Sequence, residues 1–223
     1  MKIEEKDSLT YDDISIIPSH SDVLSRKFCN TSVEFGNYNL GIPLIASPMD
    51  TVCGVNMCVE LARLGGLGVL HRFQSIEEQV DLCYDLENEI GNHYMAAIGV
   101  GVNGRNRFDS LASYTNIQGV CIDVAHGHHS LVAGMIGYIK KEFPDIHVMA
   151  GNIVTKESAK YLTEAGADSL RVGIGNGSMC ETRIRAGVGV PQATAIQDIY
   201  NYVDTQCLEG EEPMIVADGG CKT

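Results

Sequence analysis

Short apolar runs alternate with longer amphipathic stretches along most of the chain. The apolar runs are rich in Val, Ile, Leu and Ala and show no polar alternation, which is typical of strands buried on both faces. They lie at residues 43–46, 67–70, 95–100, 119–123, 147–150, 169–172 and 214–217. The stretches that predict helices lie between them, at 56–63, 76–90, 105–114, 130–143, 156–165 and 192–204. This alternation predicts a βα repeat with a parallel sheet.

Residues capable of chemistry follow six of these strands, at the point where each strand ends. They are Asp123 and the segments 47–50, 71–72, 151–152, 173–180 and 218–220. An open sheet concentrates its site at one crevice, whereas a closed ring gathers residues from the loops after all its strands. We therefore predict an α/β fold of the (β/α)8 TIM-barrel type, with one domain over residues 1–223. Because the sequence reaches Thr223 just after the seventh strand, we expect the barrel to be truncated there and less stable than a complete one.

Composition and charge narrow the possible partners. The 223 residues are 44% hydrophobic and 20% charged, which excludes a disordered or fibrous chain. The net charge of −13 argues against duplex nucleic acid. No stretch approaches the ~20 apolar residues of a membrane helix, and the acidic N-terminus does not resemble a signal peptide. The eight Cys are scattered without a C-x-x-C pair, so we expect reduced thiols in a cytoplasmic protein.

A glycine-rich loop at residues 173–183 carries the strongest chemical signal. Gly173, Gly175 and Gly177 alternate after an apolar strand, so the backbone there can expose amides to an anion or carbonyls to a cation. Ser178 adds a hydroxyl donor suited to phosphate, and Cys180 follows in a polar loop near two arginines. Neighbouring positive charge favours the nucleophilic thiolate. A flexible turn with an incidental thiol is the simpler alternative.

Acidic residues end two other strands. Asp218, followed by Gly219 and Gly220, can accept from both hydroxyls of a ribose while the next amides bind phosphate, although Asp-Gly is also a common turn. Asp123 ends a buried strand, where a carboxylate needs a partner. Three histidines follow it at 126, 128 and 129, but no further ligand cluster supports a metal site, so we expect solvated loop histidines. Arg171, inside a buried strand, must meet an anion or carbonyls.

The combination of motifs resembles the inosine-monophosphate dehydrogenase and guanosine-monophosphate reductase family. The resemblance covers nearly the whole chain and rests on motifs in the family's order. They are Pro48-Met49-Asp50-Thr51-Val52, Gly65-Gly66-Leu67-Gly68-Val69-Leu70-His71-Arg72, Ala150-Gly151-Asn152, the segment 171–180, Gly187-Val188-Gly189-Val190-Pro191-Gln192 and Ala217-Asp218-Gly219-Gly220. The resemblance implies a (β/α)8 barrel that works as a homotetramer and binds a purine nucleotide monophosphate, with NADPH or NAD as cofactor.

The resemblance also implies roles for individual residues. Cys180 resembles the nucleophile that attacks C2 of the purine, and Thr182 the threonine that assists water or ammonia at that carbon. The implied substrate-binding residues are Ser47 and Met49 at the purine, Asp218 at the ribose, and Ser178, Gly219 and Gly220 at the phosphate. Asp123 would meet the nicotinamide ribose, with Asn152 and Arg171 lining the same space. The carbonyls of Gly175, Gly177 and Cys180 match the family's monovalent-cation loop, which implies K⁺.

The dehydrogenases and the reductases of the family differ in several sequence features. Only one predicted helix lies between Arg72 and Met95, where dehydrogenases usually carry a regulatory insertion, and Val124-Ala125 also resembles the reductases. Arg171 and the segment 187–195 resemble bacterial dehydrogenases, whereas Asn176 and Glu181 fit neither pattern. Asn176 lies in the cation loop and puts K⁺ in question, while Glu181 adds negative charge beside Cys180, which would slow its attack. GMP reductase is therefore favoured, and IMP dehydrogenase, a non-catalytic nucleotide-binding remnant and a flavin- or phosphate-binding barrel of another family remain alternatives. Because residues specific to each activity follow the seventh strand in the family, we expect little turnover from this chain alone.

Overall fold

Seven parallel strands form one curled sheet in the computed structural model, which describes residues 7–177, 182–208, 210 and 212–221. The strands pair in the order in which they occur along the chain. They are β3 (Ile45–Ala46), β4 (Leu67–Leu70), β5 (Tyr94–Ile98), β6 (Gly119–Asp123), β7 (His147–Ile153), β8 (Ser169–Val172) and β9 (Met214–Ala217). This curled sheet with its helices confirms the prediction of a (β/α)8-type barrel that reaches its seventh strand.

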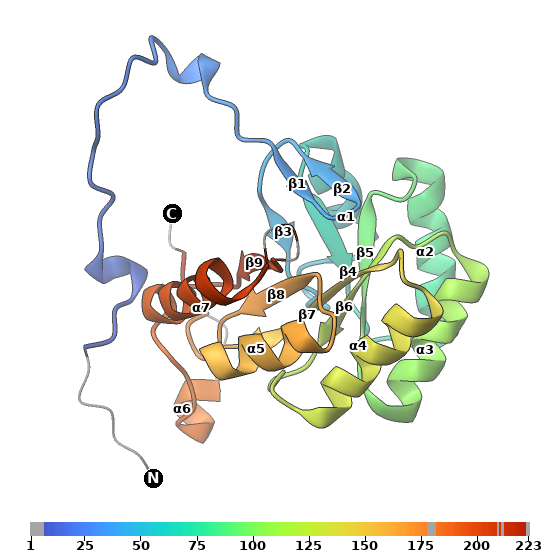
Figure 1. The fold of residues 1–223 in the computed structure, drawn as a ribbon. Helices are drawn as coiled ribbons and strands as arrows, with labels where there is room; N and C mark the ends of the chain where they lie inside the picture. The colour runs from blue at the N-terminus through green and yellow to red at the C-terminus, as the bar shows by residue number, and fades with distance from the viewer. Residues whose placement is uncertain (1–6, 178–181, 209, 211, 222–223) are drawn as a thin grey trace.

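The helices pack on the outer face of the sheet (Figure 1). They are α1 (Val55–Arg63), α2 (Ile76–Ile90), α3 (Gly101–Tyr114), α4 (Ser130–Glu142), α5 (Lys156–Glu164) and α7 (Gln192–Gln206), with the short α6 (Thr182–Ala186) after β8. Alternate residues of each strand face these helices, as Leu70, Ile98 and Ile122 do. Among the described residues no helix is long and apolar enough to cross a membrane.

A separate β-hairpin supplies side chains to the interior of the barrel. It consists of β1 (Val33–Phe35) and β2 (Tyr38–Leu40), and its buried residues pack with inward-facing residues of the sheet such as Val69 and Met95. Tyr38 Oη donates to the carbonyl oxygen of Tyr94 at 2.8 Å. Because Tyr94 begins β5, the hairpin covers the amino end of the barrel. The prediction from the sequence did not include this hairpin.

Residues 7–32, before the hairpin, form an extended arm outside the barrel (Figure 1). It contains two short 3-10 helices, η1 (Tyr11–Asp13) and η2 (Arg26–Phe28). Its described start is attached to α7, because Leu9 N donates to Thr194 Oγ1 at 2.7 Å and Thr194 N donates to the Leu9 carbonyl at 3.2 Å.

Two boundaries differ from those predicted by more than two residues. Helix α3 begins at Gly101 rather than at residue 105, because Gly101 adopts a φ of +69° that turns the chain directly into the helix. A Cβ on Gly104 would lie 2.4 Å from the carbonyl of Gly99, so only glycine allows this close approach. Strand β7 runs on to Ile153, three residues beyond the prediction, through an irregular register between Gly151 and Ile153.

The described cysteines form no disulfide, as expected, and four of them are buried. Cys121 lies in the interior of the barrel, and Cys53, Cys58 and Cys83 lie between the sheet and the helices. These four thiols therefore pack as small apolar groups. Cys180 lies outside the residues that the structure describes.

Candidate functional site

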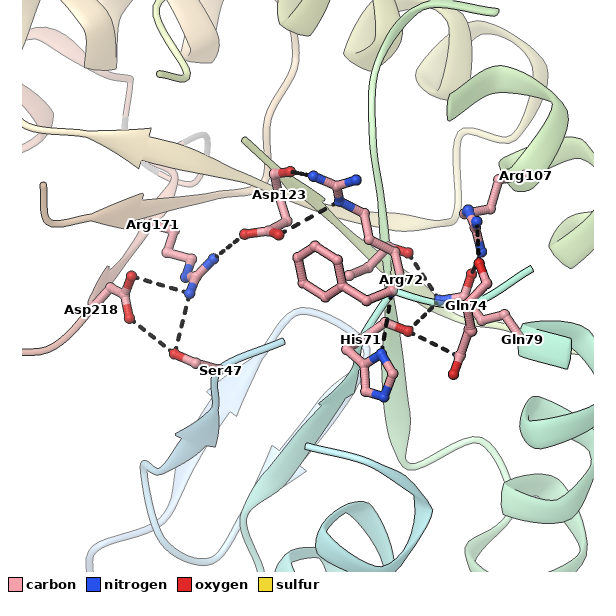
Figure 2. A network of polar contacts seen from close by, with 11 residues as sticks. Ser47, His71, Arg72, Gln74, Gln79, Arg107, Asp123, Arg171 and Asp218 are labelled. Atoms are coloured by element: carbon pink, nitrogen blue, oxygen red, sulfur yellow. Dashed lines mark hydrogen bonds and ion pairs between the residues drawn. The ribbon is translucent and has the colours of Figure 1, made fainter. Parts of the chain in front are cut away.

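Polar side chains from five strand ends meet at the carboxyl end of the sheet, and Figure 2 shows four of them, Ser47, Asp123, Arg171 and Asp218. We call this group the carboxyl-end cluster. It consists of Ser47 after β3, Asp123 at the end of β6, Asn152 in β7, Arg171 in β8 and Asp218 after β9. Ser47 Oγ donates to Asp218 Oδ1 at 3.0 Å, so residues after the first and the last strand of the sheet touch. The curl of the sheet therefore brings together residues that are 171 positions apart in sequence.

Arg171 lies at the centre of the carboxyl-end cluster, with a side chain only 9% exposed. Its Nη1 donates to Asp123 Oδ1 at 2.7 Å, and its Nη2 lies 3.1 Å from Asp218 Oδ2. The Nη2 also donates to Ser47 Oγ at 3.2 Å. Burial disfavours the guanidinium charge, but the nearby acidic groups outweigh it and raise the pKa of Arg171 above its ordinary value. One buried cation thus bridges two carboxylates.

Both oxygens of Asp218 already have partners. Oδ1 accepts from Ser47, and Oδ2 accepts from Asn152 Nδ2 at 2.5 Å as well as from Arg171. Asn152 Nδ2 also donates to the carbonyl of Gly173 at 2.6 Å. These are hydroxyl, amide and guanidinium donors, which are the kinds of group that the hydroxyls of a sugar could replace.

Asp123 is held from two sides. Arg171 donates to its Oδ1. Arg72, in the loop after β4, donates from Nη2 to the Asp123 carbonyl oxygen at 3.1 Å. The Nε of Arg72 lies 3.6 Å from Asp123 Oδ2, and the guanidinium lies 5.2 Å from the centre of the Phe73 ring. Figure 2 shows this row of alternating charges from Asp218 through Arg171 and Asp123 to Arg72. Each carboxylate is neutralised locally in spite of the acidic chain.

A cavity of about 320 Å³ opens beside this row of charges. It is lined by polar groups and by the aromatic ring of Phe73, and its residues are Arg72, Phe73, Asp123, Val124, Ala125, Asn152, Arg171, Gly173, Ile174 and Thr182. This volume is at the lower end of the range for small-molecule sites, which is about 300–1,000 Å³. A small molecule, or part of a larger one, could fit in this volume.

The glycine-rich loop packs directly on the turn that follows β9. Asn176 Nδ2 donates to the Asp218 carbonyl oxygen at 2.8 Å. A Cβ on Gly173 would lie 2.3 Å from that same oxygen. Gly219 and Gly220 adopt φ values of +77° and +82°, a conformation that glycine alone adopts readily. These glycines let two loops approach each other beside Asp218.

The close approach of β7, which carries Asn152, to β8, which carries Arg171, also depends on a glycine. A Cβ on Gly151 would lie 2.6 Å from both the Cβ and the carbonyl oxygen of Arg171. Gly151 therefore lets β7 pass close to β8 just where the carboxyl-end cluster begins. This gives a physical reason for the Gly151-Asn152 motif.

The predicted site residues divide into three groups. Ser47, Asp123, Asn152, Arg171 and Asp218 come together, and Thr182 lines the cavity beside them. Met49, half-buried, shares the loop of Ser47, while Gly175, Gly177, Gly219 and Gly220 lie in the two packed loops. Ser178 and Cys180 lie outside the described residues. Of the histidines, His129 accepts from Leu131 N as the cap of α4, and His128 contacts the Tyr161 ring.

Gln79 and Arg107 also belong to this region, although no motif in the sequence indicates it. Both are buried, at 0% and 8% exposure, and both bond to the loop that carries Arg72. They occur in amphipathic helices, where a glutamine or an arginine ordinarily faces solvent. No signal in a single sequence distinguishes them from such surface residues.

Comparison with known proteins gives consistent matches over almost the whole chain. A model of the family described as "IMP dehydrogenase / GMP reductase domain" matches residues 8–223. The chain is 33% identical to the inosine-5'-monophosphate dehydrogenase of Borreliella burgdorferi over 97% of its length. It is 36% identical to the GMP reductase of Bacillus licheniformis and 34% identical to the inosine-5'-monophosphate dehydrogenase of Cryptosporidium parvum, each over 96% of its length.

The alignments differ in length. The chain spans 64%, 63% and 62% of these three relatives respectively, just under two thirds of each. The two dehydrogenases align over 268 and 254 positions, whereas the reductase aligns over 218. Because nearly the same share of this chain is matched each time, the longer alignments include positions that have no counterpart here.

Proposed function

Because the chain belongs to the IMP dehydrogenase / GMP reductase family, we propose that it contributes the catalytic barrel of an NAD(P)-dependent purine nucleotide oxidoreductase, and that its reaction is GMP reduction. The observation that carries the proposal is the bridge of Arg171 between Asp123 and Asp218. It supports two ribose-binding carboxylates side by side, one for the substrate and one for the cofactor.

The substrate side is centred on Asp218. We assign its carboxylate to the ribose hydroxyls of the nucleotide, and the turn at Gly219 and Gly220, together with Ser178, to the phosphate. Ser47 and Met49 would flank the purine. The loop of Gly173 packs against the backbone of Asp218, so we expect a ligand to approach the Asp218 carboxylate from the carboxyl end of the barrel.

The cofactor side is centred on Asp123, and the groups around it fit a nicotinamide ribose. The side chain of Asp123 is 20% exposed and borders the cavity of about 320 Å³, so its oxygens can accept from ribose hydroxyls. Asn152 and Arg171 line the same cavity and can donate to a carboxamide. We expect NADPH, with NAD as the alternative. When bound, the nicotinamide supplies or accepts the hydride.

The residues of the chain then have distinct tasks in GMP reduction. The thiolate of Cys180 attacks C2 of GMP, and the 2-amino group leaves as ammonia, so the sulfur is bonded to C2. Hydride adds to C2, the C–S bond breaks, and IMP and the thiolate are released. The hydroxyl of Thr182 would bind the departing ammonia. The atoms and charges balance as GMP, NADPH and two protons giving IMP, NADP⁺ and ammonium.

Two observations favour the reductase over the dehydrogenase. Val124 and Ala125 line the cofactor cavity, where the dehydrogenase resemblance would place two serines. The alignment with a reductase is also shorter by 36 to 50 positions than those with the dehydrogenases, which supports the absence of an insertion in this chain. Arg171 is the observation that favours IMP oxidation with NAD and water, because it resembles the dehydrogenases.

We further propose that the assembled protein is a cytoplasmic homotetramer and that the carbonyls of Gly175, Gly177 and Cys180 bind K⁺. The ion can be tested without turnover. We expect a higher melting temperature in KCl than in choline chloride at equal ionic strength, because an ion that binds only the folded state stabilises it. Equal melting temperatures would remove K⁺ from the proposal.

The proposal is tested by covalent labelling and by absorbance. A 6-chloropurine riboside monophosphate should label Cys180 by loss of chloride, and excess GMP should prevent the labelling. Cys29 and Cys221, both exposed, are internal controls for non-specific reaction, and Cys180→Ala is the negative control. Because we expect little turnover from this chain alone, absorbance at 340 nm is followed at protein concentrations comparable to that of the cofactor, and GMP plus NADPH against IMP plus NAD then decides between the two reactions. Binding without labelling or turnover would instead indicate a non-catalytic remnant.

A further inference from the structure

Arg107 is a buried cation that the proposed mechanism does not use. It lies in α3 and is 8% exposed. Its Nη1 donates to Gln79 Oε1 at 2.8 Å and to the Ser75 carbonyl at 3.2 Å, and its Nη2 donates to the Gln74 carbonyl at 2.8 Å (Figure 2). All three acceptors belong to the segment from the end of β4 into α2.

Gln79 extends these contacts to the start of the same loop. It is fully buried, and its Nε2 donates to the His71 carbonyl at 3.1 Å and to the Ala97 carbonyl at 3.0 Å. Gln74 Nε2 donates to the same His71 carbonyl at 3.0 Å. Arg107 and Gln79 therefore hold the 71–75 loop at both of its ends.

Arg72 is the one residue of this loop that reaches Asp123 in Figure 2. Its Nη2 donates to the Asp123 carbonyl oxygen at 3.1 Å, and its Nε lies 3.6 Å from Asp123 Oδ2. The position of Arg72 is set by the backbone of the 71–75 loop, because its neighbours on both sides are anchored. A continuous set of contacts thus leads from α3 to the proposed cofactor carboxylate.

Burying Arg107 at this place has a cost. Desolvation lowers the pKa of Arg107, and the positive charge of Arg72 lowers it further. An apolar side chain would fill the same space between helices without that cost. What an apolar side chain cannot do is donate to the acceptors of the 71–75 loop at the same time.

We propose that Arg107, together with Gln79, is a positioning residue for the cofactor subsite: it fixes the 71–75 loop and thereby holds Arg72 against Asp123. This inference rests on the proposed function, because it assumes that Asp123 meets the cofactor. It concerns one subsite only, since the contacts of Asp218 come from Ser47, Asn152 and Arg171.

Two variants and one matched control test the inference. Arg107→Lys keeps the charge but has no planar fork for three acceptors. Gln79→Glu keeps the shape but loses the Nε2 donors to His71 and Ala97. Arg105→Lys is the control, because Arg105 lies in the same helix with its side chain 58% exposed and pairs with Asp109.

The readout is affinity for two ligands. We expect Arg107→Lys and Gln79→Glu to weaken NADPH binding, followed by its fluorescence, on the order of tenfold, as loss of one or two buried hydrogen bonds would. GMP binding, measured by calorimetry, should stay within about twofold, and the control should change neither. Equal losses for GMP and NADPH, or no loss for either, would overturn the positioning role.

Hydrogen exchange on the free protein keeps the inference separate from the proposed function. We expect faster amide exchange in the 71–75 loop of both variants, and unchanged exchange in Arg105→Lys. Unchanged exchange in the two variants would overturn the inference even if NADPH binds as proposed. If the wild-type chain binds neither GMP nor NADPH, the proposed function fails, and the exchange data still decide whether Arg107 positions the loop.

Discussion

The two ends of the barrel interior bury side chains of opposite character. Strand β8 contributes to both, because Ser169 and Arg171 are two residues apart and face the same side. At the amino end, Ser169 Oγ lies 2.9 Å from His147 Nε2, beside the ring of Phe35 from the hairpin. At the carboxyl end, Arg171 bridges two carboxylates. The interior of the amino end is lined by uncharged and largely apolar groups, whereas the interior of the carboxyl end contains ion pairs.

This difference between the two ends indicates where the fold is stabilised and where a ligand would bind. Apolar packing at the amino end lowers the free energy of the folded state without requiring a partner. Buried ion pairs contribute little net stability, because desolvation offsets their attraction, yet removing one partner is costly. We therefore expect the amino end to serve folding and the carboxyl end to serve recognition.

The largest expected effect comes from removing the central cation. Arg171→Met leaves Asp218 without a counter-ion and leaves Asp123 with Arg72 alone, so the free energy of unfolding at pH 7 should fall by about 3–5 kcal/mol. Urea denaturation followed by circular dichroism measures it. A loss below about 1 kcal/mol, the range of surface ion pairs, would mean that Arg171 does not act as a buried bridge between the two carboxylates.

The apolar end should respond almost as strongly, but without any effect on ligands. Leu40→Ala removes a side chain of the hairpin that is 2% exposed, and about 3 kcal/mol of unfolding free energy should be lost. The affinity of the folded protein for GMP, measured by calorimetry, should be unchanged. A weaker affinity at full folding would break the separation of the two ends.

Acid should destabilise the amino end through His147. Burial is the main cause that lowers the pKa of His147 to about 4 in the folded protein, below the ordinary value of about 6.5 that applies after unfolding. Between these values the unfolded chain binds the proton more readily, so stability is lost as pH falls. The expected loss is about 2 kcal/mol at pH 5.

The His147→Gln variant serves as the control for this titration. It removes the ionisable group, so its unfolding free energy should depend less on pH between about 6.5 and 4 than that of the wild type. Parallel pH profiles for the two proteins would show that His147 is not held neutral at the amino end.

The smallest effect concerns one hydrogen bond of the hairpin. Tyr38→Phe loses only the donation from Oη to the Tyr94 carbonyl, so we expect a loss of about 1 kcal/mol. Thermal unfolding measures it, with Tyr84→Phe, at a half-exposed position of α2, as the control. A neutral result would mean that this bond does not help to hold the hairpin, which then depends on packing and on the donations of Asn37 Nδ2 to the Gln118 and Asp145 carbonyls.

Much of the fold could be predicted from periodicity. Strands buried on both faces leave apolar runs, and their carboxyl ends must meet, so the meeting of Ser47, Asp123, Asn152, Arg171 and Asp218 follows from topology. The hairpin was missed because its strands have three residues each, too short for a periodic signal. The two-residue turn Gly36-Asn37 between alternating apolar residues was the available signal.

The positions of buried polar side chains could not be predicted in the same way. Arg107 and Gln79 satisfy backbone carbonyls of a loop that is more than 30 positions from Arg107. Such pairing depends on how helices pack on the sheet, and not on local sequence. The separate prediction of roles for Ser178 and Cys180 stays a prediction, because both lie outside the described residues.

The decisive experiment for the proposed site is a crystal structure of the chain with GMP. We expect the ribose hydroxyls to bind Asp218 in place of Ser47 or Asn152, the phosphate to meet Gly219 and Gly220, and C2 of the purine to face the sulfur of Cys180. A nucleotide bound elsewhere, with Asp218 still paired to Ser47, Asn152 and Arg171, would contradict it.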